Sequence, residues 1–263
     1  MKRFIFLLML IVSIPVICGF YAMGDTQKPK QVIKSVKVYP DFNLDTWVDP
    51  MGESKEELVV EEKPKEDLST VKLIGRIAEG IKTVKGNYFW ICGKKLEDKD
   101  RDDTALSMAY HIVKSSQGAG FNPWGVAGTM ANESGFDPCA LGLNPRKWAV
   151  KNGLLDEKWN GLYQSKESVL RVVRDERANK YFKRSGFDLG LCQVLTRFYP
   201  TEVEDLLTIE KGIQICVTEM GYRSQKNKTK NPWLYWKGTN PTYWYAEKVR
   251  RWARKMGARK GEI

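Results

Sequence analysis

Glu133 is the acidic side chain whose place in the sequence is most typical of a catalytic group. The segment opened by Asn122 and Pro123 follows a helical pattern, in which Val126, Met130 and Glu133 lie on one stripe. A carboxyl group at the C-terminal end of an apolar stripe is poorly hydrated, and the negative end of the helix dipole also disfavours its ionised form. Both effects favour a protonated carboxylic acid, which is what general acid catalysis requires. The plain alternative is that Glu133 faces water at a frayed helix end.

Four short segments with recognisable residue patterns occur in order along this part of the chain. Residues 131–138 read Ala-Asn-Glu-Ser-Gly-Phe-Asp-Pro, and residues 187–194 read Phe-Asp-Leu-Gly-Leu-Cys-Gln-Val. Residues 234–238 read Leu-Tyr-Trp-Lys-Gly, and residues 245–249 read Tyr-Ala-Glu-Lys-Val. They resemble, in the same order, the ESGF(N/D)P, (Y/F)D(I/L)GLMQ(I/V), AYNAG and Y-x-x-(K/R)-V motifs of lytic transglycosylases and goose-type lysozymes. One such match would be weak evidence, but four in the right order make the resemblance specific.

The resemblance implies a role for three residues at the helix end. Glu133 is expected to be the single catalytic acid/base, which protonates the glycosidic oxygen between N-acetylmuramic acid and N-acetylglucosamine. Tyr245 is expected to donate a hydrogen bond to Glu133 and to orient it. Ser134 is expected to tie down the end of the catalytic helix. A structural alternative for Tyr245 is a core aromatic residue, because it also falls on the apolar stripe of its own helix.

Three further positions are expected to meet the substrate. The resemblance implies that Gln193 hydrogen-bonds the glycan near the cleaved bond and that Tyr235 lines the groove. Gly190 is expected to form a turn that lets the backbone approach the sugar. The alternatives are a surface position for Gln193 and a core position for Tyr235.

The chain also departs from the family pattern. Gly190 follows Glu133 by 57 positions, a longer separation than the family usually has, which implies an insertion at about 143–186. We expect this insertion to lie beside the groove and to influence which glycan strands fit. Cys192 stands where the family has Met, and Trp236 stands where it has Asn.

The reaction implied by the resemblance is lytic transglycosylation of peptidoglycan. The β-1,4 bond would break with formation of 1,6-anhydro-N-acetylmuramic acid, and no cofactor or metal would take part. One alternative is a goose-type hydrolase, which needs a second carboxylate to activate water, from Asp137 or Asp188. The other is a non-catalytic peptidoglycan-binding protein on the same fold.

The N-terminal part predicts export. Residues 1–24 have a short basic start, an apolar run and a small-x-small site, which together indicate a signal peptide or a membrane anchor. Residues 25–70 are rich in charge and contain scattered prolines, which is typical of a linker. The domain is therefore expected at 71–263, in the periplasm or cell envelope.

The charge distribution favours an acidic partner of the domain. The chain has a net charge of +11, of which residues 71–263 carry +13 and residues 25–70 carry −4. A basic surface suits nucleic acid, an anionic membrane or the acidic bacterial wall. Export argues against nucleic acid, so the expected partners are peptidoglycan glycan strands, with a membrane tether if the leader is retained.

The cysteines allow disulfides in an oxidising compartment. If Cys18 is removed with the predicted signal peptide, four cysteines remain, namely Cys92, Cys139, Cys192 and Cys216. They can form two disulfides in three ways, and the sequence does not decide among these pairings. A disulfide at Cys139 would brace the segment after Glu133. The single histidine and the lack of a CxxC motif make a zinc site improbable. A Cys–His hydrolase would need His111 near Cys139 or Cys192.

The elements that must position these residues are predicted to be helices. Helical spacing extends over 103–116, 165–183 and 208–222, besides the helix that ends at Glu133. A last helix is expected between Asn240-Pro241 and Gly257, and Thr201-x-x-Glu204 is typical of a capping box. Few stretches alternate with a period of two. The sequence thus favours a mainly α, lysozyme-like domain with a substrate groove, preceded by the exported segment and tether.

Overall fold

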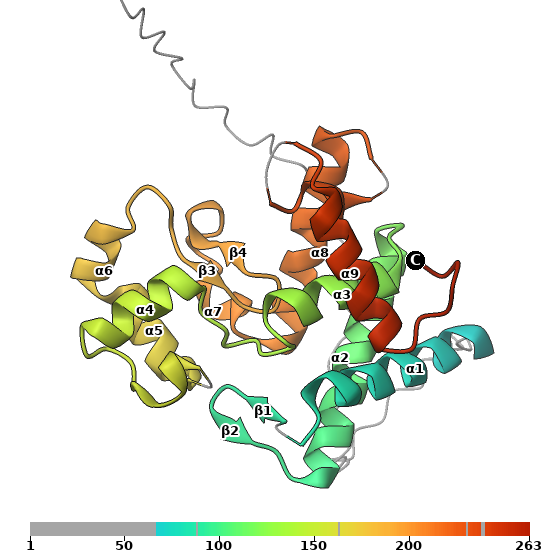
Figure 1. Ribbon diagram of the computed structural model, residues 1–263, viewed down its shortest axis with the longest axis horizontal. Helices are drawn as coiled ribbons and strands as arrows, with labels where there is room; N and C mark the ends of the chain where they lie inside the picture. Colours follow the sequence, from blue (N-terminus) through green and yellow to red (C-terminus); the bar gives the residue numbers. More distant parts are fainter. Residues whose placement is uncertain (1–66, 88, 163, 230, 238–239) are drawn as a thin grey trace, which may run out of the picture. The chain divides into compact units, whose positions relative to one another are not determined.

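The computed structural model describes residues 67–263 apart from 88, 163, 230, 238 and 239. The predicted signal peptide or anchor, and nearly all of the predicted linker, lie outside the described residues. The described part is mainly helical, as the sequence predicted (Figure 1). None of its helices combines the length and the apolar character needed to cross a bilayer.

The elements follow one another as helices interrupted by two short hairpins. In chain order they are α1 (Leu68–Lys85), β1 (Trp90–Ile91), β2 (Lys94–Lys95), α2 (Asp98–Gly118), α3 (Pro123–Glu133), α4 (Leu143–Lys151), η1 (Lys158–Gly161), α5 (Lys166–Arg174), α6 (Glu176–Tyr181), β3 (Asp188–Leu189), β4 (Val194–Leu195), η2 (Thr196–Phe198), α7 (Val203–Leu206), α8 (Ile209–Lys226), η3 (Pro232–Tyr235) and α9 (Tyr243–Lys255). Each hairpin is antiparallel, and β3 pairs Asp188 with Leu195.

Helix α3 is the central element of the fold. Every residue from Trp124 to Ala131 is buried, and the helix packs against α9, α2 and α1 (Figure 1). As predicted, Asn122 caps it by accepting a hydrogen bond from the backbone of Trp124 at 2.9 Å, with Pro123 in the first turn. A helix that is apolar all round is stable only inside a core, and this burial fixes the position of its C-terminal end.

Two glycines allow the neighbouring elements to approach α3 closely. A Cβ atom on Gly128 would lie 2.5 Å from the carbonyl oxygen of Val249 on α9. A Cβ atom on Gly125 would lie 2.5 Å from the ring of Trp233 on η3. Both distances are far below van der Waals contact, so only glycine fits at these positions.

The predicted insertion at about 143–186 folds into a group of short helices, α4, η1, α5 and α6. Their buried apolar residues include Ala149, Val169 and Val172. An aromatic contact joins this group to the second hairpin, because the ring centroids of Phe182 and Phe187 lie 5.3 Å apart. The insertion therefore has apolar residues of its own in the core, and it packs on the rest of the fold through this contact.

Two disulfides connect loops to this framework. Cys92, in the turn between β1 and β2, is bonded to Cys139, and Cys192, in the turn between β3 and β4, is bonded to Cys216 on α8. This is one of the three pairings that the sequence left open. The bond at Cys139 lies in the segment after Glu133, as expected for a brace.

Several predicted boundaries are wrong, for identifiable local reasons. The helix predicted over 165–183 is broken at Asp175, whose carboxylate instead caps the backbone of Ala178. Thr201 forms no capping box, because its hydroxyl bonds the carboxylate of Glu202. Helix α9 begins at Tyr243, whereas Asn240-Pro241 was expected to open it.

The late start of α9 and the early start of α1 also have local causes. The backbone N–H of Thr242 donates to the carbonyl of Leu234, which holds this segment against η3 before the helix begins. At the other end, Asp67 caps α1, so residues 68–70 of the predicted linker belong to the first helix.

The packing of α3 on α9 leads to a stability prediction. Gly128→Ala should lower the free energy of unfolding by about 1–3 kcal/mol, because the new methyl group overlaps the Val249 carbonyl. Gly221→Ala is the matched control on α8, where a Cβ atom meets nothing within 4 Å. The control should raise stability by up to about 1 kcal/mol through helix propensity. Urea unfolding of both variants checks this, and equal effects would contradict the packing described.

Candidate active site

Glu133 lies at the C-terminal end of α3, with its carboxylate turned into the protein. Its side chain is only 7% exposed. The alternative of a residue facing water at a frayed helix end is therefore wrong. One carboxylate oxygen, Oε1, accepts a hydrogen bond from the Tyr245 hydroxyl at 2.6 Å, and the other, Oε2, forms an ion pair with the Lys237 ammonium at 2.9 Å.

Tyr245 is the contact that the sequence predicted for Glu133. It is fully buried on α9, and its hydroxyl donates the bond that fixes the direction of the carboxylate. Burial raises the pKa of Tyr245 well above its usual value, and the nearby negative charge of Glu133 raises it further. The phenol therefore stays a hydrogen-bond donor at every physiological pH.

Ser134 joins the end of α3 to the second hairpin. Its hydroxyl lies 2.8 Å from the Leu191 carbonyl oxygen and 3.1 Å from the Met130 carbonyl oxygen. Leu191 belongs to the turn that carries Gln193. The serine thus holds the helix end beside that turn, which is the position expected for it.

The segment after α3 pairs with β3, and this pairing places Gln193. The backbone N–H of Gly142 donates to Asp188, the N–H of Gly190 donates to Ala140, and Leu141 forms a bridge with Leu189. The Gln193 amide nitrogen then lies 3.0 Å from the carbonyl oxygens of both Ala140 and Gly190.

The orientation of the Gln193 side chain follows from these bonds. Because the amide nitrogen is occupied, the oxygen Oε1 is the atom of the group left to accept a hydrogen bond. A Cβ atom on Gly142 would lie 3.3 Å from this oxygen and 3.1 Å from Oδ2 of Asp188. Gln193 and Asp188 therefore lie side by side against Gly142. Among the described contacts, none joins Gln193 directly to Glu133.

Gly190 forms the turn that was predicted, with a φ of 74°. The residue is buried, and the space where a Cβ atom would stand is occupied by the backbone carbonyl of Leu206. Packing against the end of α7 is therefore sufficient reason for a glycine here. Its approach to a sugar stays a prediction.

Tyr235 is half-buried at the end of η3. Its backbone carbonyl accepts a hydrogen bond from Arg223 on α8, together with the carbonyl of the neighbouring Trp236. No described contact brings the Tyr235 side chain to Glu133. Trp236, which departs from the family pattern, is buried beneath the Arg223 guanidinium at 4.7 Å.

Lys237 is the functional candidate that the sequence reasoning missed. Its ammonium pairs with Glu133 and also lies 5.3 Å from the centre of the Tyr245 ring. The side chain is 42% exposed, so the ion pair lies at the surface of the site. In the sequence, Lys237 is one basic residue among many in a basic domain, and only its position within the 234–238 motif gave any signal.

The two other acidic candidates occupy different environments. Asp137 is buried, and its Oδ1 accepts hydrogen bonds from the backbone of Cys92 at 3.1 Å and of Cys139 at 3.0 Å. These bonds give Asp137 a turn-forming role. Burial raises the pKa of Asp137, while the charge of Lys85 acts to lower it.

Asp188 lies closer to the chemistry of Glu133. It is half-buried on β3, and burial is the main cause that raises its pKa. Lys237 acts to lower this pKa and the charge of Glu133 acts to raise it. These three side chains therefore form one electrostatic group at the end of α3.

The disulfides change how the cysteines can be interpreted. The side chains of Cys92, Asp137 and Cys139 come close enough to resemble a metal-binding cluster. Both sulfurs are bonded to each other, so neither is a thiolate ligand. For the same reason Cys139 and Cys192 hold no free thiol, and the Cys–His hydrolase alternative with His111 is wrong.

Comparison of the chain with protein-family models, with curated proteins and with solved structures finds no match. The geometry of the residues around Glu133 is therefore the basis for any functional proposal.

Proposed function

We propose that this protein is a peptidoglycan lytic transglycosylase on a lysozyme-like scaffold, and that it cleaves the β-1,4 bond between N-acetylmuramic acid and N-acetylglucosamine. The observation that carries the proposal is the Glu133 carboxylate, which is almost fully buried and held by Tyr245 at the tip of the central helix. A buried carboxylate with a fixed direction is suited to move a proton at one defined point.

The proposed reaction uses this single group twice. Protonated Glu133 gives its proton to the bridging oxygen as the C1–O bond breaks and an oxocarbenium-like centre forms. The resulting carboxylate then accepts the proton of the muramoyl 6-hydroxyl, whose oxygen closes on C1 to form the 1,6-anhydro ring. No water is consumed, and the nucleophile belongs to the same sugar, so its effective concentration is very high.

The neighbours of Glu133 support the two steps in different ways. Tyr245 stays a donor throughout, so it holds the carboxyl group in both protonation states. The Lys237 ammonium holds the second carboxylate oxygen, Oε2, so both oxygens of the group have a partner. Gln193, with its oxygen free to accept, is proposed to bind a sugar hydroxyl or amide.

The cellular setting proposed for this activity is the periplasm or cell envelope. Peptidoglycan lies outside the cytoplasm, and the two disulfides are typical of proteins that fold in an oxidising compartment. The basic charge of the domain suits the acidic wall. The leader would serve as a cleaved signal peptide or as a membrane tether.

The first test is Glu133→Gln, which removes the transferable proton but keeps the shape of the side chain. We expect muralytic activity on purified cell walls to fall by roughly 10²–10⁴-fold or more. Glu157→Gln, an exposed residue, is the control and should keep full activity. Circular dichroism should show an unchanged fold for both variants. Retained activity in Glu133→Gln would remove Glu133 from the mechanism. Clearance by neither variant nor wild type would favour a non-catalytic peptidoglycan-binding protein.

A second candidate, goose-type hydrolysis, is supported by Asp188, which is electrostatically coupled to Glu133 and half-exposed. The two reactions differ in their products, because a hydrolase leaves a reducing end that is heavier by one water than the anhydro end. Mass analysis of the released muropeptides decides between them. We expect anhydro ends, and we expect Asp188→Asn to keep most of the activity. Reducing ends together with a loss of activity in Asp188→Asn would establish the hydrolase instead.

The Lys237 ion pair leads to a further prediction. Lys237 holds one oxygen of the Glu133 carboxylate, so Lys237→Met should loosen its direction and lower muralytic activity. The loss should be much smaller than that of Glu133→Gln, because the ion pair is partly exposed. Lys260→Met, at an exposed position, is the control for the loss of one charge and should keep full activity. Equal activity of the two variants on purified cell walls would mean that Lys237 does not act on Glu133.

A further inference from the structure

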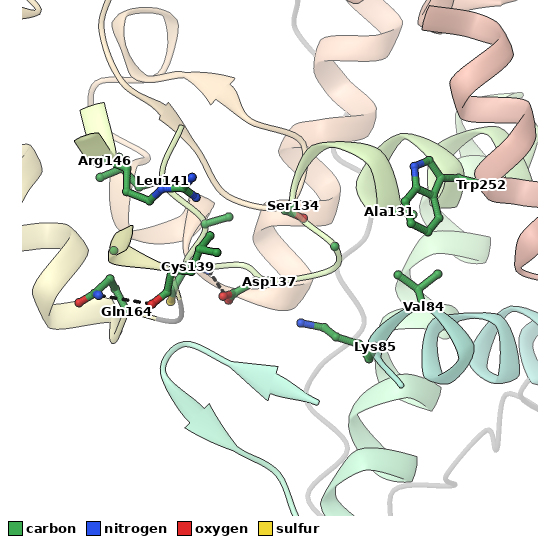
Figure 2. A pocket seen from close by; sticks show the side chains of 14 residues that line it. Val84, Lys85, Ala131, Ser134, Asp137, Cys139, Leu141, Arg146, Gln164 and Trp252 are labelled. Carbon is green, nitrogen blue, oxygen red and sulfur yellow. Dashed lines mark hydrogen bonds between the residues drawn. The ribbon is translucent and has the colours of Figure 1, made fainter. Parts of the chain in front are cut away.

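A cavity of about 440 Å³ lies directly beside the end of α3 (Figure 2). Ser134 and Gly135, the residues that follow Glu133, form part of its wall, together with Trp252 of α9. This volume is large enough for a group that branches from a glycan strand. The cavity therefore adjoins the segment that follows Glu133, whose own side chain is not part of its wall.

The opposite wall of the cavity comes from the insertion that separates this chain from the family pattern. Arg146 of α4, Gly161 of η1, and the following Leu162 and Gln164 all line it. The insertion thus shares this cavity with the segment that follows Glu133, and it contributes a cationic side chain to the wall.

Arg146 is the cation in this wall that no acidic group compensates. Its guanidinium points inward, towards Leu141 (Figure 2). Its Nε is buried without a hydrogen-bond partner in the described part of the chain. Burial alone lowers the pKa of Arg146, with no carboxylate acting against it. A partly buried charge without a counter-charge is costly, unless a ligand supplies one.

Lys85, on the other side of the cavity, by contrast faces an acidic side chain. Its ammonium points towards Asp137 (Figure 2) and donates a hydrogen bond to the Trp90 carbonyl at 2.6 Å. Burial lowers the pKa of Lys85 to about 8, and the charge of Asp137 acts to raise it. Arg146 is therefore the group in the cavity wall that is available for an anion.

The position of Arg146 is fixed by packing on Gly161. A Cβ atom on this glycine would lie 2.9 Å from Cγ of Arg146 and 2.9 Å from Cγ2 of Val150. The glycine, at a φ of 70°, lets the aliphatic stem of the arginine lie flat against η1. The guanidinium is thus held in place before any ligand arrives, which reduces the entropic cost of binding.

We infer that the insertion builds a binding site for a carboxylate carried by the glycan strand, with Arg146 as the residue that binds it. The inference rests on the proposed function and deepens it, because it names the class of strand that the protein would prefer. An arginine binds a carboxylate through two parallel hydrogen bonds, which suits a fixed guanidinium in a small cavity. The carboxylate comes either from the peptide stem or from the lactyl group of the muramoyl residue.

Three substrates distinguish a carboxylate of the peptide stem from a carboxylate of the lactyl group. Strands with intact peptides carry peptide carboxylates, strands stripped by an amidase carry free lactyl carboxylates, and chitin oligosaccharides carry neither. Binding is measured by titration calorimetry in the Glu133→Gln background, so that the strands are not cut. Arg146→Met, which keeps the aliphatic stem, should lower affinity for one carboxylate-bearing class roughly tenfold relative to chitin oligosaccharides. Arg146→Lys should restore part of this difference.

Lys147→Met is the matched control, since it removes one charge from the adjacent, exposed position of α4. It should leave the ratio of affinities unchanged. The inference is overturned if Arg146→Met weakens all three substrates equally, changes none of them, or behaves like Lys147→Met. Cleavage by the wild type in those cases would leave the proposed function standing. A wild type that neither binds nor cleaves any strand would overturn both.

Discussion

Everything around the end of α3 depends on holding one carboxylate away from water. Burying a charged or protonated carboxyl group is unfavourable unless both oxygens find partners. Here the partners come from a different part of the chain, since Tyr245 lies on α9 and Lys237 lies just before it. The close packing of α9 on α3, which the missing side chain of Gly128 permits, is therefore what allows Glu133 to be buried at all.

A second set of constraints holds the two loops that complete the site. Each loop carries a disulfide, Cys92–Cys139 in the segment after α3 and Cys192–Cys216 in the turn of Gln193. The Ser134 hydroxyl joins the two segments directly through the Leu191 carbonyl. Loops on which functional groups sit are usually mobile, and covalent links of this kind restrict their motion before substrate arrives.

The acidic residues near the site show how environment separates similar groups. Asp137 accepts two backbone hydrogen bonds on one oxygen and stabilises a turn, whereas Asp188 lies in the electrostatic field of Glu133 and Lys237. The two cations of the cavity wall also differ in their surroundings. Lys85 faces Asp137, while Arg146 has no acidic neighbour in the described chain. Arg146 is thus the cation of the cavity wall on which no acidic group acts in the described chain.

The sequence by itself determined the helical character, the cap at Asn122 and the contact of Tyr245 with Glu133, because these follow from local periodicity and from the order of the motifs. It placed the end of the linker inside α1, placed the start of α9 too early and missed the break at Asp175, where individual hydrogen bonds override helical propensity. Only the tertiary structure decided the disulfide pairing, the Lys237 ion pair and the place of Arg146 in a cavity wall. Each of these joins residues far apart in the sequence, and the distance between such residues is set by packing rather than by any local pattern.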